Sequence, residues 1–211
     1  LTVCHELSSG AALVPEVGAM YGPEAVSETA LIRQSLAQLP PDSVVMADAG
    51  FGIFSVAYQI KLARHVFLLR MTQQRFDSLK KKAELMESGD RHKVWSHRWT
   101  PSAKERTSHP DLPQDAMLEI RLHEIVINEH LTLLLVTDLE DTSDEVAALY
   151  ERRNDVEIDI RNLKVVLDTE HLRARSVDTV MKELLASVVS YNLVTQFRCQ
   201  AAELISEPPR R

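Results

Sequence analysis

Short apolar runs and amphipathic stretches alternate along the first third of the chain. The apolar runs are typical of strands, whereas the stretches between them repeat their apolar residues every three or four positions, as helices do. Pro40-Pro41 ends the first of these helices. The predicted elements are strands at residues 1–7, 11–20, 42–47 and 66–71 and helices at residues 23–38 and 51–64.

One of these strands ends in a carboxylate. Strands 42–47 and 66–71 are joined by a helix, and a connection of this length implies a parallel pair with a right-handed crossover. Asp48 directly follows the first of the two strands, and open α/β sheets bind their ligands at the carboxyl ends of parallel strands. Asp48 is therefore a candidate functional residue, although an Asp in this position also commonly forms a turn or caps a helix.

The middle of the chain is polar and then β-rich. Periodicity weakens from residue 72 to residue 128, but Leu118, Ile120 and Leu122 alternate with polar residues, which predicts a half-buried strand. The apolar run at residues 131–139 follows after a short polar connection. We expect these two runs to form a hairpin.

The last third of the chain is helical and carries a second group of candidate residues. Asp141-Thr142-Ser143 offers an N-cap for the first helix. Tyr150, Arg153, Glu157 and Lys164 follow with the spacing Y-x2-R-x3-E-x6-K, and at about 100° per residue they share one narrow face of a single helix. Such a face suits a metal held beside phosphates, but it also fits a surface helix with an i,i+4 ion pair. The predicted apolar stripe of this helix is Leu149, Val156, Ile160, Leu163 and Leu167, and a further helix at residues 177–198 packs through Val180, Leu184, Val188, Tyr191 and Leu193.

Composition and charge narrow the possible classes of protein. The chain has 211 residues, 45% of them hydrophobic, enough for one core with an inserted subdomain. Its formal net charge of -7 argues against a uniformly basic nucleic-acid binder, so any DNA contact must use a local patch. No apolar run approaches the roughly 20 residues that span a bilayer. Cys4 and Cys199 have no C-x2-C partner, so the sequence indicates neither a disulfide framework nor a zinc site. We expect a cytoplasmic protein without a membrane partner.

One basic segment could provide the DNA contact. Residues 61–106 contain twelve Lys or Arg and five Asp or Glu, and Trp95 and Trp99 interleave with them. Phosphate contacts and base stacking could therefore occur together there. The same residues also fit a solvated helix face and tryptophans that pack in a small sheet. The DNA-binding candidates in this segment are Lys80, Lys81 and Lys82.

Two motifs together resemble those of one family. The spacing Y-x2-R-x3-E-x6-K resembles the signature of bacterial insertion-sequence transposases of the DDE type, and VVMADAGFG, residues 44–52, resembles the strand that ends in their second catalytic Asp. The resemblance implies an α/β fold, namely an RNase H-like mixed sheet flanked by helices, with a mainly β insertion between the second Asp and the Glu. The implied parts are the first portion of the catalytic core at 1–71, the insertion at 72–139, the helical part of the core at 140–205 and a disordered tail at 206–211.

The resemblance also implies a chemistry for the matching residues. Asp48 and Glu157 would hold a two-ion site of Mg²⁺, or Mn²⁺, for cleavage at transposon ends and strand transfer. Tyr150, Arg153 and Lys164 would bind phosphates near the cleaved end. The implied partners are terminal inverted repeats, target DNA and a second copy of the chain in a synaptic complex on the bacterial nucleoid.

The sequence departs from the family pattern at its start and within the signature. It opens with Leu1 in a predicted strand and lacks the first catalytic Asp, which relatives carry on a preceding strand, so we expect an amino-terminally truncated and catalytically incomplete fragment. Asn154 stands where relatives often carry an aromatic residue. Two alternatives remain open: a catalytically inactive remnant that binds DNA or protein through its basic segment, and a metal-dependent nuclease of the same fold that only hydrolyses.

Overall fold

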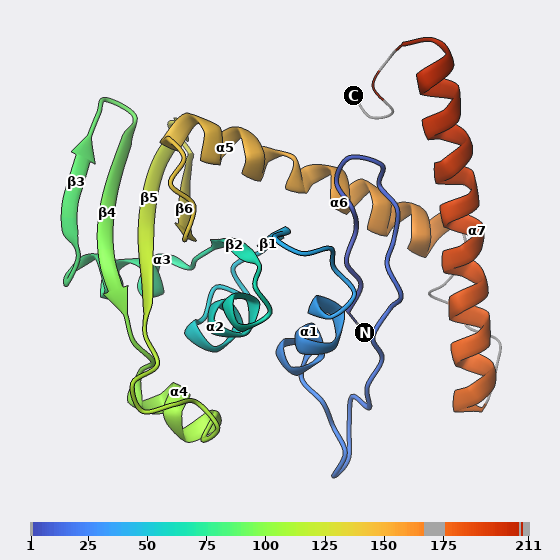
Figure 1. The fold of residues 1–211 in the computed structure, drawn as a ribbon, viewed down its shortest axis with the longest axis horizontal. Helices are drawn as coiled ribbons and strands as arrows, with labels where there is room; N and C mark the ends of the chain where they lie inside the picture. The colour runs from blue at the N-terminus through green and yellow to red at the C-terminus, as the bar shows by residue number, and fades with distance from the viewer. Residues whose placement is uncertain (1, 167–175, 207, 209–211) are drawn as a thin grey trace. The chain divides into compact units, whose positions relative to one another are not determined.

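A computed structural model describes residues 2–166, 176–206 and 208 of the chain (Figure 1). Leu1, Leu167 and, apart from Ser206 and Pro208, the predicted disordered tail lie outside the described residues. In chain order the elements are α1 (Glu28–Leu36), β1 (Val44–Ala47), α2 (Phe54–Leu62), β2 (Val66–Arg70), α3 (Gln73–Lys80), β3 (Glu84–Ser88), β4 (His92–Trp99), α4 (Ala103–Ser108), β5 (Leu118–Asn128), β6 (Leu131–Thr137), α5 (Ser143–Glu151), α6 (Arg153–Arg161), the π-helix η1 (Asn162–Val166) and α7 (Val177–Leu204).

The chain divides into two compact units. The sheet unit is the continuous segment Leu39–Glu151, and the terminal unit combines Leu1–Gln38 with Arg152–Arg211. The boundary at residue 151 falls between α5 and α6, within the stretch that the sequence predicts as one helix. No described helix is both long enough and apolar enough to cross a membrane.

The sheet unit is built on a six-stranded mixed sheet with the strand order β1-β2-β6-β5-β4-β3. β1 and β2 pair in parallel, which confirms the predicted strand-helix-strand arrangement. β6 pairs antiparallel with β2, and the remaining pairs are also antiparallel. The strands of the predicted insertion therefore continue the same sheet that begins with β1 and β2, and β1 lies at its edge (Figure 1).

The core of the sheet unit lies where the hairpin β5–β6 meets β2 and α5. The predicted burial of Leu118, Ile120 and Leu122 in β5 is confirmed, but His123, one of the polar residues that alternate with them, is buried as well. Leu68 of β2 and Leu135 of β6 are fully buried and pack with residues of α5. Burial of each such side chain contributes about 1.5–3 kcal/mol, so these contacts hold the strands and α5 together.

Two helices, α1 and α2, begin later than the sequence predicts. α1 starts at Glu28, not at residue 23, since the Ser27 hydroxyl accepts a hydrogen bond from the backbone N–H of Ala30 at 3.2 Å. α2 starts at Phe54, not at residue 51, because the preceding residues form a turn and Ile53 is extended. The predicted cap of α5 is confirmed: Thr142 and Glu145 exchange hydrogen bonds between side chain and backbone.

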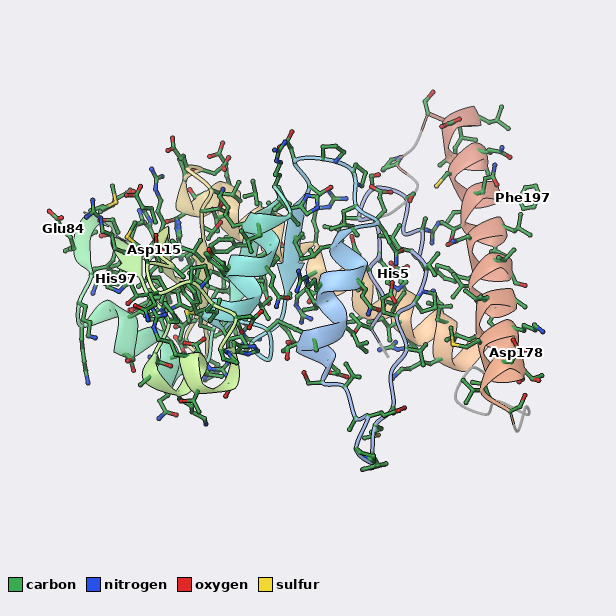
Figure 2. The ribbon with its side chains drawn as sticks, turned by 60° about the horizontal axis from the view of Figure 1, so that its bottom comes forward. His5, Glu84, His97, Asp115, Asp178 and Phe197 are labelled. Carbon is green, nitrogen blue, oxygen red and sulfur yellow. The ribbon has the colours of Figure 1, made fainter. Side chains whose placement is uncertain are left out.

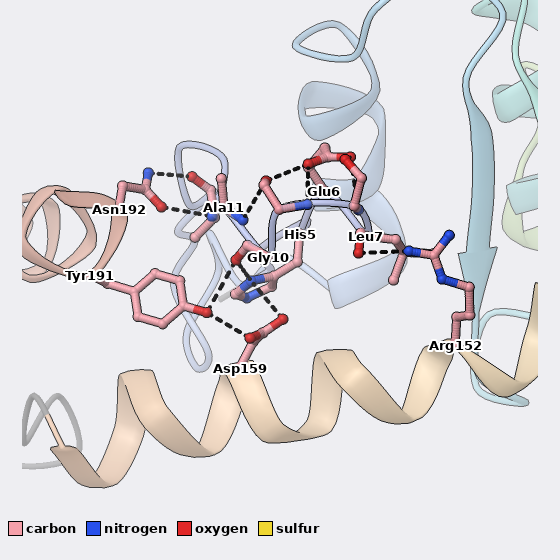
Figure 3. A network of polar contacts seen from close by, with 12 residues as sticks. His5, Glu6, Leu7, Gly10, Ala11, Arg152, Asp159, Tyr191 and Asn192 are labelled. Atoms are coloured by element: carbon pink, nitrogen blue, oxygen red, sulfur yellow. Dashed lines mark hydrogen bonds and ion pairs between the residues drawn. The ribbon is translucent and has the colours of Figure 1, made fainter. Parts of the chain in front are cut away.

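The terminal unit contains α1, α6, η1 and α7, and no strand among its described residues. Residues 2–16 turn back on themselves, but their antiparallel pairing is limited to isolated bridges, so the two predicted strands are wrong. Tyr191 of α7 anchors this segment: its hydroxyl lies 2.7 Å from Asp159 Oδ1 and 3.1 Å from the Gly10 carbonyl oxygen (Figure 3). The buried network therefore joins α6, α7 and the amino-terminal turn.

α7 differs from its prediction in length and in one packing residue. It continues to Leu204, and Leu184, Val188 and Tyr191 are buried as predicted. Leu193 is 51% exposed, which contradicts its predicted place in the core. Leu193 follows Tyr191 by two residues, which in an α-helix is a rotation of about 200°, so its side chain points away from the face that Tyr191 buries. Phe197, four residues further on, is also exposed (Figure 2).

Candidate functional site

Asp48 lies immediately after β1, at the carboxyl end of a parallel strand, and is exposed. Its Oδ1 accepts a hydrogen bond from the backbone N–H of Gly50 at 2.9 Å, and its carbonyl oxygen accepts one from Phe51 at 3.1 Å. These bonds form the turn that the sequence offers as the structural explanation of this residue. Among the described residues nothing bonds to Oδ2, so the turn leaves half of the carboxylate available.

Contacts from elsewhere in the sheet unit fix the loop that carries Asp48. A Cβ on Gly52 would lie 2.2 Å from the carbonyl oxygen of Arg70, so this residue must be glycine for the loop to lie against β2. The Arg75 guanidinium donates from Nη1 to the carbonyl oxygen of Ala49 at 2.8 Å. The loop is thus held from β2 and from α3 before any ligand binds.

The signature residues occupy three elements, so the prediction of one uninterrupted helix is wrong. Tyr150 belongs to α5, Arg153 and Glu157 belong to α6, and Lys164 belongs to η1. A turn at Arg152 separates the first two helices. A π-helix takes more residues per turn than an α-helix, so the 100° spacing does not extend to Lys164.

Tyr150 is buried rather than available to a phosphate. It is 4% exposed and packs in the core of the sheet unit with Leu68 and Leu135. Its hydroxyl donates to the carbonyl oxygen of Ala47, the last residue of β1, at 3.4 Å. Through this contact the phenol braces the strand end next to Asp48, a role that the sequence did not predict.

Arg153, Glu157 and Lys164 lie in the terminal unit. Arg153 Nη2 donates to Glu157 Oε1 at 2.6 Å, the i,i+4 pair that the alternative interpretation expects. The Glu157 side chain is 57% exposed and that of Arg153 is 24% exposed, and Lys164 is exposed on η1. A pair of this kind contributes only about 0.3–0.5 kcal/mol, so it orients the carboxylate without restraining it strongly.

The two carboxylates have the ligand chemistry that a divalent ion needs. Asp48 and Glu157 both present exposed carboxylate oxygens, the hard ligands that Mg²⁺ and Mn²⁺ prefer. Within the described part of the chain, no group of three or more His, Cys, Asp or Glu residues is placed to hold a metal ion. Asp48 belongs to the sheet unit and Glu157 to the terminal unit.

Comparison with known families identifies the chain. The model of the transposase DDE domain matches residues 17–193, a range that contains both Asp48 and the signature. The chain belongs to the transposase DDE domain family. The six-stranded mixed sheet flanked by helices agrees with the predicted RNase H-like α/β fold of such a domain. A comparison with curated proteins gives no match.

The lysine triplet of this transposase domain does not act as one patch. Lys80 Nζ donates to Glu124 Oε2 at 2.6 Å and lies 4.4 Å from the centroid of the Trp95 ring. It therefore supports the packing of α3 on the sheet. Lys81 and Lys82 are exposed beyond the end of α3.

The tryptophans of the transposase domain are core residues. Trp95 and Trp99 are 6% and 5% exposed. Each makes an edge-to-face contact, Trp95 with Phe76 at 6.0 Å and Trp99 with Phe54 at 5.5 Å between ring centroids. Packing, rather than the stacking of bases, thus accounts for both rings.

A basic groove next to the Asp48 loop is a feature that the sequence reasoning missed. It lies between α3, the end of β4 and α4, and has a volume of about 870 Å³. Burial lowers the pKa of His97 at its edge below the usual value, and the charge of Lys82 lowers that pKa as well. The excess of cations in residues 61–106 was the available signal, but their convergence depends on how β4 and α4 fold.

Proposed function

We propose that this transposase DDE domain catalyses metal-dependent cleavage at transposon ends and joins the resulting 3′-hydroxyl to target DNA. The observation that supports it is the pair of exposed carboxylates inside the matched range: Asp48 at the carboxyl end of a parallel strand and Glu157 on α6. The proposal therefore assigns the catalytic role to these two residues.

The chain's own residues divide the work of the proposed reaction. Asp48 and Glu157 would hold two divalent ions, Mg²⁺ or Mn²⁺, which when bound activate the attacking oxygen and stabilise the leaving oxygen. Arg153 orients the Glu157 carboxylate through its 2.6 Å hydrogen bond. Lys164 offers an exposed ammonium group to a phosphate. Tyr150 acts as a positioning residue, since it holds the carbonyl of the residue before Asp48.

The proposed partners are DNA and a second copy of the protein. Terminal inverted repeats supply the strand that is cut, and target DNA supplies the phosphodiester that is attacked. A second copy would bring the two transposon ends together in a synaptic complex, so that both ends are cut and joined in one assembly.

A catalytically inactive remnant that only binds DNA or protein is the second candidate function. It is favoured by the contacts that already use both carboxylates: Asp48 closes a turn with Gly50, and Glu157 pairs with Arg153. Each contact stabilises structure without any metal. The two candidates differ in one measurable respect, which is whether DNA is cut.

The test uses protein expressed from its complete coding sequence, DNA that carries the element ends, and Mg²⁺. Asp48→Asn and Glu157→Gln keep the shape of each side chain but remove its charge, and we expect each to reduce cleavage by at least about 100-fold. Asp178→Asn is the matched control, because Asp178 forms the same kind of i,i+4 pair, with Lys182 on α7. Binding of the ends in EDTA should persist in all three variants.

Other outcomes would overturn parts of the proposal. Cleavage that survives Glu157→Gln would make α6 a structural helix. A wild-type protein that binds ends but never cuts them would be the inactive remnant. Nicking without strand-transfer products would identify a nuclease.

A further inference from the structure

The groove beside the Asp48 loop is formed entirely by the sheet unit. Its walls come from α3, from the last residues of β4 and from α4, which follows the end of β4. Gly52 and Met71, which lie just after β1 and β2, also line it. Gly52 belongs to the loop that carries Asp48, so the groove borders this loop, and its geometry belongs to one compact unit.

Three cationic side chains from α3, from the residues after it and from α4 line this groove. The single carboxylate in the lining is Glu105, and its oxygens accept hydrogen bonds from the backbone N–H groups of Phe54 at 2.8 Å and Ser102 at 3.0 Å. A chain with a net charge of -7 thus concentrates positive charge in one concave place, where it attracts anions most effectively. The three cationic residues are Arg75, Lys82 and Lys104, whereas Arg98, which also borders the groove, pairs through Nε with Glu119 of β5 at 3.8 Å.

Arg75 connects the groove to the Asp48 loop. It lines the groove, and its Nη1 donates to the carbonyl oxygen of Ala49, the residue after Asp48, at 2.8 Å. An arginine has five N–H donors in a planar fork, so this bond leaves donors for a phosphate. An anion in the groove would therefore be held next to the loop that presents the carboxylate.

The size of the groove favours one strand over a duplex. About 870 Å³ falls within the range of about 300–1,000 Å³ that encloses a ligand of drug size. That space suits a few nucleotides of one strand, whereas a duplex needs a wider surface. Hydroxyl groups of Ser78, Thr100 and Ser108 in the lining add neutral donors for phosphate oxygens.

We propose that this groove binds the sugar-phosphate backbone of a single DNA strand, a few nucleotides long, next to Asp48. The inference rests on the proposed function, because the strand is taken to be the one that the transposase cuts or displaces at a transposon end. The contacts are ionic and read no base sequence.

The test compares two double variants of the full chain that remove the same number of positive charges. Lys82→Gln/Lys104→Gln removes two positive charges from the groove. Lys93→Gln/Arg91→Gln removes two positive charges from exposed positions at the opposite end of β4, outside the groove. Fluorescence anisotropy with labelled oligothymidylate, in EDTA and over a series of salt concentrations, measures affinity without any contribution from a metal ion.

We expect the groove variant to bind oligothymidylate about tenfold more weakly than wild type at low salt. Its slope of log affinity against log salt should fall by about 1.4, because each lost phosphate contact removes about 0.7 for a single strand. The variant at the other end of β4 should lose less than about twofold. Wild type should bind the single strand more tightly than a duplex of the same length.

Three results would overturn the proposal. Equal losses in the two double variants would mean that the attraction is diffuse rather than local to the groove. Tighter binding of the duplex would exclude the single strand as the ligand. Displacement of oligothymidylate by a polyglutamate peptide at equal charge would indicate a protein partner instead.

The outcome is separable from the test of catalysis. Asp48→Asn and Glu157→Gln should bind oligothymidylate as wild type does, since the measurement is made in EDTA. If only the groove variant loses affinity and cleavage is never seen, the proposed catalytic function is wrong but the assignment of the groove is supported. If cleavage depends on both carboxylates but the two double variants bind alike, the groove assignment alone fails.

Discussion

Acid should destabilise the sheet unit through one buried histidine. His123 lies in β5, is 1% exposed, and its Nδ1 is hydrogen-bonded to the hydroxyl of Ser143 at 3.1 Å. Its Nε2 has no partner among the described residues. Burial, reinforced by the positive charge of Arg121, lowers the pKa of His123 to about 4. The folded protein therefore holds this imidazole neutral where an exposed histidine would already be charged.

The sign and size of the effect follow from proton linkage. In the unfolded chain His123 has its ordinary pKa of 6.5, so between pH 6.5 and about pH 4 the unfolded state binds more protons than the folded state. The contribution of His123 to stability is fully present above pH 6.5 and is lost as the pH falls through this window. A difference of about 2.5 pKa units corresponds to about 3 kcal/mol at 1.36 kcal/mol per unit.

The assay uses the two tryptophans of the chain, Trp95 and Trp99, which are buried in the same sheet as His123. Urea unfolding followed by their fluorescence reports the sheet unit at a series of pH values. His123→Gln keeps a donor and an acceptor near Ser143 but cannot take up a proton in this range. His130→Gln, at an exposed position in the β5–β6 connection, is the matched control.

The prediction concerns the slope with pH rather than the absolute stability. The free energy of unfolding of wild type and of His130→Gln should fall by about 3 kcal/mol more than that of His123→Gln between pH 6.5 and pH 4. Parallel curves for His123→Gln and wild type would refute the reasoning. They would mean that His123 is protonated in the folded state or that its site admits water.

Two packing predictions can be measured alongside. Gly52→Ala should destabilise the sheet unit by about 1–3 kcal/mol in the same fluorescence assay, because the added Cβ would lie 2.2 Å from the backbone oxygen of Arg70. A change in stability smaller than the experimental error would show that the loop can move away from β2. Tyr191→Phe should lower stability by about 1–3 kcal/mol in thermal unfolding followed by circular dichroism, since the buried Asp159 loses a hydrogen bond, whereas Tyr21→Phe at an 81% exposed position should change it by less than about 0.5 kcal/mol. Equal effects of the two tyrosine variants would contradict a structural role for the buried network.

Regular periodicity was enough to predict four of the six strands of the sheet unit, but not β3 or β4, which lie where the periodicity is weak. The parallel pair of β1 and β2 follows from the length of the helical connection between them, and the hairpin β5–β6 follows from strict alternation and a short polar link. Both are local patterns whose partners are close in sequence. Residues 2–20 show the limit of this reasoning, because apolar alternation makes a segment suited to a strand but does not supply a neighbour for it.

The signature stretch shows a second limit. Its spacing is helical throughout, yet α5 ends at Glu151, α6 begins at Arg153 and a π-helix begins at Asn162. Side-chain spacing predicts that a segment is helical, but a turn or a π-helical step arises from backbone hydrogen bonds that the spacing does not encode. A single angle per residue therefore cannot be carried from Tyr150 to Lys164.

The basic segment shows a third limit of reasoning from sequence. Lys80, Lys81 and Lys82 are equivalent in the sequence, but only Lys80 reaches Glu124 and the Trp95 ring. Which of the three lysines makes these contacts depends on how α3 packs on the sheet, because Glu124 is 44 residues away from Lys80 along the chain. Composition could locate an excess of charge in this segment, whereas the groove that uses it is a product of tertiary structure.

The contacts that hold the two candidate carboxylates differ in their distance along the chain. This difference explains why the sequence predicted the contact of Glu157 but not the contacts that brace the loop of Asp48. The contacts around Asp48 come from distant residues: Arg75 and Tyr150 bond to its two chain neighbours across 26 and 103 residues. Glu157 has an i,i+4 contact that can be read directly from the sequence. Ordering a free Glu side chain costs up to about 2 kcal/mol of conformational entropy. Glu157 has a single weak contact on α6, so ligand binding must supply more of this ordering cost for Glu157 than for Asp48, whose loop is already braced. Substitution of Arg75 or Tyr150 should therefore impair cleavage through the placement of Asp48, even though neither residue supplies a metal ligand.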